Sequence, residues 1–277
     1  MNILEGWEDW AALLGALSTG ALLGHNLWLV APRLRPAPGE SLRIEINTSD
    51  LFPTSETAIT EDRIADFIVH ADAGAAPVRG FHVAGESLIA EVDAARRGAL
   101  LAALTLHPRL ISLEPAKFHS YLCEERAQAA IDARAAAGED SLPGREIYTK
   151  YAKLLVGADD GGSLLHRRSC GHRFEILPMT NPCALRPGDR LSVQVLLDGA
   201  PASGLRVSAG CEGVLEGGYL SHATADDEGR AEILVPGPGR WYLRTHCIRP
   251  HENRSVADWE SFWASLTVLS EDADPGA

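Results

Sequence analysis

The chain has 277 residues, of which 45% are hydrophobic, so it is long enough for two ordinary domains with buried cores. Its formal net charge of -13 argues against nucleic acid and anionic membranes as partners, because both select for basic patches. The 26 glycines and 16 prolines predict many short elements separated by turns, which favours a β-rich architecture over a helical bundle.

Residues 10–24 form an apolar run, WAALLGALSTGALLG, which is too short to span a membrane. The run has the length and the small residues of a signal-peptide core, although the preceding segment is acidic and the first basic residue is Arg33. We predict that residues 1–24 form a signal peptide-like segment, cleaved after Gly24, and that the mature protein is periplasmic. The alternative is an amphipathic or buried N-terminal helix.

Cleavage after Gly24 makes His25 the first residue of the mature chain. A terminal histidine offers its α-amine and its imidazole to one metal ion, and both groups deprotonate readily near neutral pH. Two nitrogen donors suit Cu(II) or Ni(II) better than Mg²⁺ or Ca²⁺. Without cleavage, His25 is an ordinary residue at the start of a strand.

Alternating apolar and polar residues predict strands in the segment that follows. Leu42, Ile44 and Ile46 alternate with polar residues, which is typical of a half-buried strand. Glycines and prolines separate further short apolar runs up to residue 113. We predict that residues 25–165 form a β-sandwich domain.

The composition then changes, and two helices are predicted. Residues 114–138 are rich in alanine, with Pro115 near the start and Gly138 at the end, which is typical helix punctuation. Residues 145–157 predict a second helix, because their apolar side chains recur at helical spacing. We therefore predict a helical insertion over about residues 114–157 of the first domain.

Residues 174–269 predict a second sandwich, because short strands are separated by Pro-Gly and Asp-Gly turn signals. The acidic turn at residues 226–229 has too few acids for a calcium loop, and we interpret it as an Asx-type turn. Residues 270–277 have almost no apolar content and are predicted to be disordered.

The end of this second sandwich is dense in metal-binding atoms. Residues 241–246 and 262–269 alternate as two strands, and a polar loop joins them. We expect the candidate ligands to lie in this loop: His246, Cys247, His251, Asp258 and Glu260.

The chain has five cysteines, without the CxxC spacing of a zinc knuckle or a thioredoxin site. We expect a Cys211–Cys247 disulfide first, because both residues fall at neighbouring strand ends of the same predicted domain. Cys170 and Cys183 are the next candidate pair. Unpaired thiols remain an equally open alternative, since sequence does not determine connectivity.

Several motifs together resemble those of a known family. They are HNLWL at 25–29, EPAKFHSYLCEER at 114–126, GREIYTKYAKLL at 144–155, NPCALRPGD at 181–189, TADDEGRA at 224–231 and ADWESFWASLTV at 257–268. With them the chain resembles the exported bacterial DUF4198 proteins, once assigned to nickel uptake, over nearly all of residues 25–268. The usual Gly-Leu of the helix motif is replaced here by Arg126-Ala127, and Asn26 stands where the family has an acid. The resemblance implies a first domain with a helical insertion, followed by an immunoglobulin- or transthyretin-like sandwich.

The resemblance also implies a pair of metal-binding histidines, His25 and His246. Cys247 stands where relatives have methionine, and a thiolate there would be a softer ligand that favours copper or zinc. The candidates to complete the shell are His119, Asp258 and Glu260.

We therefore expect an exported, non-enzymatic protein that takes part in the uptake or handling of a divalent transition metal, namely nickel, cobalt or copper. Its expected partners are the metal ion and an outer-membrane receptor or metal transporter, and no nucleic acid. One alternative is an interaction or carbohydrate-binding module that presents Trp28, Trp241, Trp259 and Trp263. Another is a copper oxygenase that uses a histidine brace. The sequence has no hydrolase elbow, phosphate loop or HExxH motif.

Overall fold

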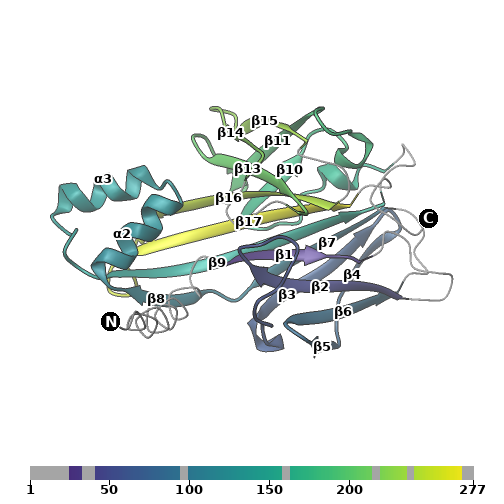
Figure 1. Ribbon diagram of the computed structural model, residues 1–277, viewed down its shortest axis with the longest axis horizontal. Helices are drawn as coiled ribbons and strands as arrows, with labels where there is room; N and C mark the ends of the chain where they lie inside the picture. Colours follow the sequence, from purple (N-terminus) through teal and green to yellow (C-terminus); the bar gives the residue numbers. More distant parts are fainter. Residues whose placement is uncertain are drawn as a thin grey trace, which may run out of the picture.

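The computed structural model describes residues 25–32, 41–93, 99–157, 163–213, 219–235 and 240–269. The predicted leader, residues 1–24, and the predicted disordered tail, residues 270–277, lie outside these ranges. The described chain is mainly β, as expected, with three sheets and two α-helices (Figure 1). Neither of these helices is long and apolar enough to cross a membrane.

Two sheets are small. The first has the order β1-β2-β6-β5, with bounds Asn26–Val30, Ser41–Ser49, Ser87–Asp93 and Phe81–Ala84. The second has the order β10-β11-β12, and β15 also pairs with β11; the bounds are Phe174–Pro178, Arg190–Leu197, Ala200–Pro201 and Arg230–Leu234. Short 3-10 turns cover Glu61–Arg63, Leu165–Arg167 and Pro182–Ala184.

The third sheet has nine described strands, in the order β14-β13-β16-β17-β9-β7-β3-β4, and β8 pairs with β9 beside this path. In that order, the bounds are Ser221–Thr224, Arg206–Cys211, Arg240–Pro250, Trp259–Leu269, Gly144–Val156, Leu100–Leu106, Ile64–Ala71 and Gly74–Pro77, with β8 at Arg109–Leu113. The long strands β16, β17 and β9 are neighbours near its middle, and β17 and β9 run parallel.

The large sheet lies between the two small ones and contributes to the two largest hydrophobic cores. Leu101 and Leu155 pack into the core shared with β10, β11 and β15. Their neighbours Ala102 and Leu154 pack into the core shared with β1, β2 and β6, because successive strand residues point to opposite faces. Figure 1 shows these two groups of strands on opposite sides of β9 and β17. Strands from both predicted domains thus share one sheet, and the domain boundary stays a prediction.

The second predicted helix, residues 145–157, is wrong: these residues form strand β9. From Tyr151 to Val156 every residue of β9 is buried, because both faces of the strand are covered. A strand buried on both faces carries a continuous apolar run, whose spacing also fits a helical stripe. The helical insertion therefore ends at Ala137 rather than near residue 157.

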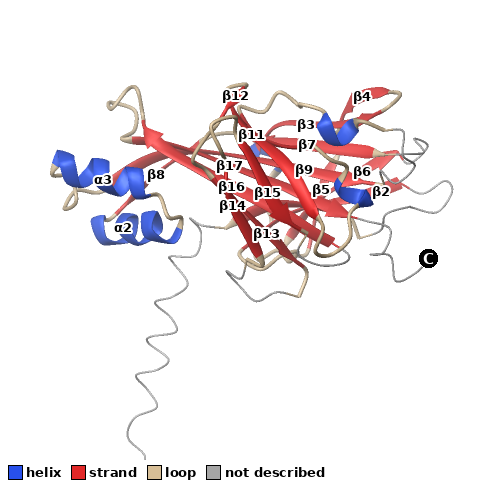
Figure 2. Ribbon diagram, turned by 90° about the horizontal axis from the view of Figure 1, so that it is seen from above, coloured by secondary structure: helices blue, strands red, loops and turns tan. Residues whose placement is uncertain are grey.

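The predicted helix 114–138 is two helices, α2 (Pro115–Glu124) and α3 (Gln128–Ala137). Pro115 opens α2, and Gly138, with φ 68°, ends α3 in the left-handed region, as the punctuation predicts. The break follows from Arg126, whose φ of 54° is left-handed and cannot continue a helix. Figures 1 and 2 show both helices at one end of β9, β16 and β17.

The closing hairpin, β16 and β17, is confirmed but is longer than expected. The strands pair from Arg240 opposite Leu269 to Pro250 opposite Trp259. Of the five candidate ligands assigned to the loop, only two lie there, namely His251 and Asp258; the other three are strand residues. The predicted Asx-type turn is confirmed, because the carboxylate of Asp226 accepts hydrogen bonds from two backbone N–H groups of that turn, at 3.0 and 2.7 Å.

The expected Cys211–Cys247 disulfide is not formed, and both residues are free thiols. Cys211 pairs across the sheet with Trp241, six residues before Cys247 on the same strand. At about 3.4 Å per residue, this separates the cysteines by roughly 20 Å, whereas a disulfide needs Cα atoms within about 7 Å. Cys170 is also a free thiol, so the second candidate pair is absent as well.

Candidate functional site

His246 lies on β16 and is buried beneath the helical insertion, with 6% of its side chain exposed. Its Nε2 lies 3.1 Å from the hydroxyl of Tyr121 on α2, and its ring centroid lies 4.3 Å from that of Trp263. Its Nδ1 lies 4.0 Å from a carboxylate oxygen of Glu125. Burial and the nearby Arg244 guanidinium hold the pKa of His246 well below its usual value, so its imidazole is neutral at neutral pH.

Glu146 lies on β9 under the same helix and is 1% exposed. Its Oε1 accepts hydrogen bonds from Tyr121, at 3.2 Å, and from Ser261. Its Oε2 has no hydrogen-bond partner among the described residues. Burial raises the pKa of Glu146 to about 7, so this acid is poised to gain or lose a proton near neutral pH.

Two cations flank the ring of Trp263 on β17. The guanidinium carbon of Arg244 lies 5.2 Å from the ring centroid, and the ammonium of Lys150 lies 5.3 Å from it. Arg244 also donates hydrogen bonds to the Glu125 carboxylate and the Tyr219 hydroxyl. Burial lowers the pKa of Lys150 to about 8. These side chains form one buried polar cluster with His246 and Glu146.

The start of the described chain reaches this cluster. The ammonium of Lys150 donates a hydrogen bond to the backbone carbonyl of His25. Two residues after His25, the carbonyl of Leu27 accepts a hydrogen bond from the hydroxyl of Ser265 on β17 at 2.5 Å. The beginning of β1 is therefore fixed on the same sheet face that carries His246 on β16, and segments far apart in the sequence meet at Lys150.

The two histidine rings have separate partners. His25 Nε2 lies 3.3 Å from a carboxylate oxygen of Glu56 and 3.9 Å from one of Asp50. The ring of His246 instead contacts Tyr121. The structure thus brings these two residues to one region, with Lys150 between them, rather than ring to ring.

His119 and Cys247 lie away from this cluster. His119 is exposed on α2, and its Nε2 lies 3.5 Å from the Cys123 thiol. Cys247 follows His246 on β16, so its side chain points to the opposite sheet face, where it packs against the core shared with β10, β11 and β15. Burial raises the pKa of the Cys247 thiol, which disfavours the thiolate form that binds metals.

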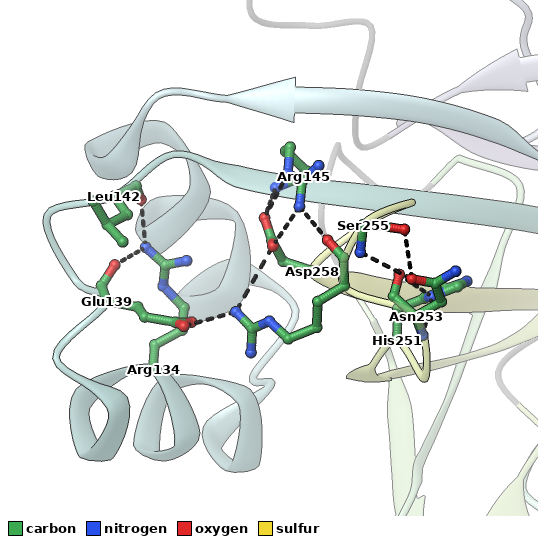
Figure 3. A network of polar contacts seen from close by, with 9 residues as sticks. Arg134, Glu139, Leu142, Arg145, His251, Asn253, Ser255 and Asp258 are labelled. Carbon is green, nitrogen blue, oxygen red and sulfur yellow. Dashed lines mark hydrogen bonds and ion pairs between the residues drawn. The ribbon is translucent and has the colours of Figure 1, made fainter.

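Asp258 belongs to a polar network that holds the helical insertion to the β16–β17 loop (Figure 3). Arg145 binds the Asp258 carboxylate with an N–O distance of 2.9 Å, and Arg254 binds Glu139 at 2.7 Å. Arg134 donates to two backbone carbonyls of the segment after α3, both at 2.8 Å. Asp258 is therefore a structural partner of arginine.

Glu260 is likewise paired with an arginine, because Arg249 Nε lies 2.6 Å from its carboxylate. The predicted ligands therefore have different neighbours and do not form one group. They are His25, His119, His246, Cys247, Asp258 and Glu260. Among the residues that the structure describes, no group of three or more His, Cys, Asp and Glu side chains is arranged to hold a metal ion.

A cleft of about 700 Å³ opens above the buried polar cluster. One wall is the turn between α2 and α3, and the floor is formed by β13, β14 and β16. Its charged lining residues are Glu124, Glu125, Arg126, Arg206 and Arg244.

Sequence reasoning missed much of the buried cluster. Glu146 and Lys150 were assigned to a helix, whereas they occupy one face of strand β9. The missed signal is their spacing: two charged residues separated by four positions, an even number, lie on the same face of a strand. Tyr121 joins them only through the tertiary contact of α2 with the sheet.

The fold and the site define a mainly β protein whose helical insertion covers a buried cluster of acids, cations and a neutral imidazole. The chain belongs to the family described as Domain of unknown function (DUF4198), which matches residues 22–249 and confirms the resemblance to this family over that range. The motif at residues 257–268 lies outside the matched residues. No curated protein matches the chain in sequence.

One solved structure compared with the chain is that of "Biofilm associated protein - BSP domain". It is 11% identical over 92% of this chain, with a TM-score of 0.17, and the chain spans 54% of that structure's length. A TM-score of this size does not indicate a shared fold.

Proposed function

We propose that the mature chain begins at His25 and that this exported, non-enzymatic protein binds a divalent nickel, cobalt or copper ion there, for metal uptake or handling. The observation that carries the proposal is the contact of His25 Nε2 with the carboxylates of Glu56 and Asp50. Metal-binding histidines almost always donate their second ring N–H to such a group. With Nε2 engaged, Nδ1 and the α-amine freed by cleavage form a six-membered chelate ring of two nitrogen donors, which suits Cu(II) and Ni(II).

His246 is the proposed second imidazole. Its ring is neutral at neutral pH, which is the form that binds metals. Lys150 lies between the two histidines, and a bound cation beside its ammonium is repelled. Because burial lowers the pKa of Lys150 to about 8, deprotonation removes this repulsion at small cost. Metal affinity should therefore rise as the pH increases towards 8.

The first test is the mature N-terminus, read by intact mass of the protein from a periplasmic fraction. The second is calorimetric titration with Cu(II), Ni(II) and Co(II) of a chain beginning at His25. We expect one ion per chain, and His25→Ala should abolish tight binding. Glu56→Gln should weaken binding by about 10–100-fold, as changes to such supporting carboxylates typically do.

Two controls make the test specific. A chain whose His25 α-amine is acetylated keeps every side chain but blocks the chelate, so it should lose tight binding. His82→Ala removes an exposed histidine on β5 and should bind normally. A mature chain that starts elsewhere, or equal affinity of the acetylated chain, would refute the proposal.

The structure does not favour the carbohydrate-binding alternative. The tryptophans that would form its platform are buried: Trp28, Trp241, Trp259 and Trp263 are 0%, 1%, 2% and 6% exposed. A copper oxygenase would use the same nitrogen ligands, and no further contact among the described residues favours that reaction. The proposed partner that delivers or receives the ion is an outer-membrane receptor or a metal transporter.

A further inference from the structure

The cleft above the buried polar cluster has the size of a ligand site. Its volume of about 700 Å³ lies within the range of roughly 300–1,000 Å³ that small-molecule sites occupy. Its floor is strand β13, β14 and β16, and its wall is the α2–α3 turn, so both halves of the site are held by rigid elements. None of the residues proposed as ligands of the metal ion at His25 contributes to it except His246.

Three arginines line the cleft, and their charges are not fully compensated. Arg244 is paired with Glu125. Arg206 and Arg126 form no ion pair with the described residues. Burial lowers the pKa of Arg206, and the positive charge of the nearby Arg126 lowers it further. Arg206 Nε is buried without a hydrogen-bond partner among the described residues. A buried donor without an acceptor carries an energetic cost that a bound acceptor would relieve.

The cleft also receives the N-terminus of helix α3. Gln128 and Ala129, the first residues of this helix, line the cleft. The helix has no side-chain cap and no acidic residue in its first turn. Its leading N–H groups and the positive end of its dipole are therefore available to an anion, in addition to the arginines.

The acidic side chains of the cleft have partners of their own. Glu125 binds Arg244, and Glu124 accepts a hydrogen bond from Ser120 at 2.9 Å. The three arginines outnumber these two acids, so the cleft is locally positive, although the whole chain has a net charge of -13. A half-buried tyrosine, Tyr219, also lines it. The planar guanidinium of arginine forms bidentate hydrogen bonds with carboxylates and phosphates.

We propose that this cleft binds a small organic oxyanion, a molecule that bears carboxylate or phosphate groups. Arg126 and Arg206 are its charged ligands, and the first N–H groups of α3 are its neutral ones. The proposal goes beyond the metal site, because it needs neither cleavage of the chain nor a metal ion.

The test is calorimetric titration of the whole chain with two probes, citrate and inorganic phosphate, at low ionic strength and without metal. We expect at least one probe to bind with one molecule per chain, and the affinity to fall as salt is added. Arg206→Gln and Arg126→Asn should each weaken binding by about tenfold or more, as loss of a charge-assisted hydrogen bond predicts. Asparagine is chosen because it tolerates the left-handed backbone at this position.

Arg190→Gln is the matched control, because Arg190 is an exposed arginine on β11, outside the cleft. Binding of citrate alone identifies carboxylate as the preferred group, and binding of phosphate alone identifies phosphate; either supports the proposal. It is overturned if neither probe binds at millimolar concentration, or if the cleft variants and Arg190→Gln bind alike. Circular dichroism verifies that each variant is folded. Copper titration of Arg206→Gln should be unchanged, so failure of one proposal is distinguishable from failure of the other.

Discussion

At the scale of single residues, the buried polar cluster places an acid where water cannot solvate its charge. Glu146 retains two hydrogen bonds at one oxygen, whereas its other oxygen has no partner among the described residues. The charged form therefore loses more hydration than it regains, and the pKa of Glu146 rises from 4.5 to about 7. A strand position that costs stability in this way is more easily explained by function than by packing.

The pKa of Glu146 predicts a pH dependence of stability. Between pH 4.5 and about 7 the folded chain binds this proton more tightly than the unfolded chain does. The stabilising contribution of this proton to the free energy of unfolding is therefore complete below pH 4.5, and it is lost as the pH rises to about 7. The Glu146→Gln variant has no titrating group at this position, so it does not lose this stability. The free energy of unfolding of the variant minus that of the natural chain should therefore increase by about 3 kcal/mol between pH 4.5 and pH 8.

Urea denaturation of both proteins across this pH range measures the difference, since the other titrating groups are common to both. Glu232→Gln, a change at an exposed position on β15, should show little dependence on pH. A constant difference between Glu146→Gln and the natural chain would mean that the pKa of Glu146 is not raised.

At the scale of elements, α2 is held on the sheet by a close approach that only glycine allows. Gly144 begins β9, and a Cβ atom there would lie 2.3 Å from the Phe118 ring on α2. Phe118 is fully buried, and the guanidinium carbon of Arg134 lies 4.9 Å from its ring centroid. The ring is thus in close contact with both Gly144 and Arg134 and has little room to move.

Gly144→Ala should therefore lower the free energy of unfolding by about 1–3 kcal/mol, which is the usual cost of overpacking a core. Denaturant titration measures the change. In the double variant Gly144→Ala with Phe118→Leu, the smaller side chain makes room for the methyl group. Its loss of stability should be smaller than the sum of the two single losses, because the two positions are in contact. Additive losses would show that the close approach does not limit this position.

At the scale of the whole molecule, one sheet contributes to the two largest hydrophobic cores. Strand β9, from the first predicted domain, pairs along its length with β17, near the end of the second. A buried ion pair, Lys153 with Glu175, joins β9 to β10 with an N–O distance of 2.9 Å. Separating the predicted domains would expose strand edges and leave buried charges without partners, which is strongly destabilising.

We therefore predict that the fragment of residues 25–165 does not fold by itself, and that the whole chain unfolds in one transition. Circular dichroism and tryptophan fluorescence should give coincident urea curves for the whole chain. The isolated fragment should show no cooperative transition. Cooperative unfolding of the fragment would instead support two independent sandwich domains.

Local patterns predicted the parts of the fold in which one face of an element is buried. Alternation predicted β2 and the closing hairpin, because period-two burial leaves a direct trace in the sequence. Pro115 and Gly138 marked the ends of the helical segment, because each residue restricts or extends the backbone angles available there. Strand β9 was missed since both of its faces are covered, which removes the alternation.

The sequence by itself determined the mainly β character, the helical insertion, the family and the histidines worth testing. Only the tertiary structure decided which residues meet: Glu146 and Lys150 with Tyr121 and His246 in the buried cluster, and Arg126 with Arg206 at the cleft. The physical reason is that local backbone preferences and burial periodicity act over a few residues. Contacts between segments more than a hundred residues apart depend instead on strand register and helix packing, which no single stretch of sequence encodes.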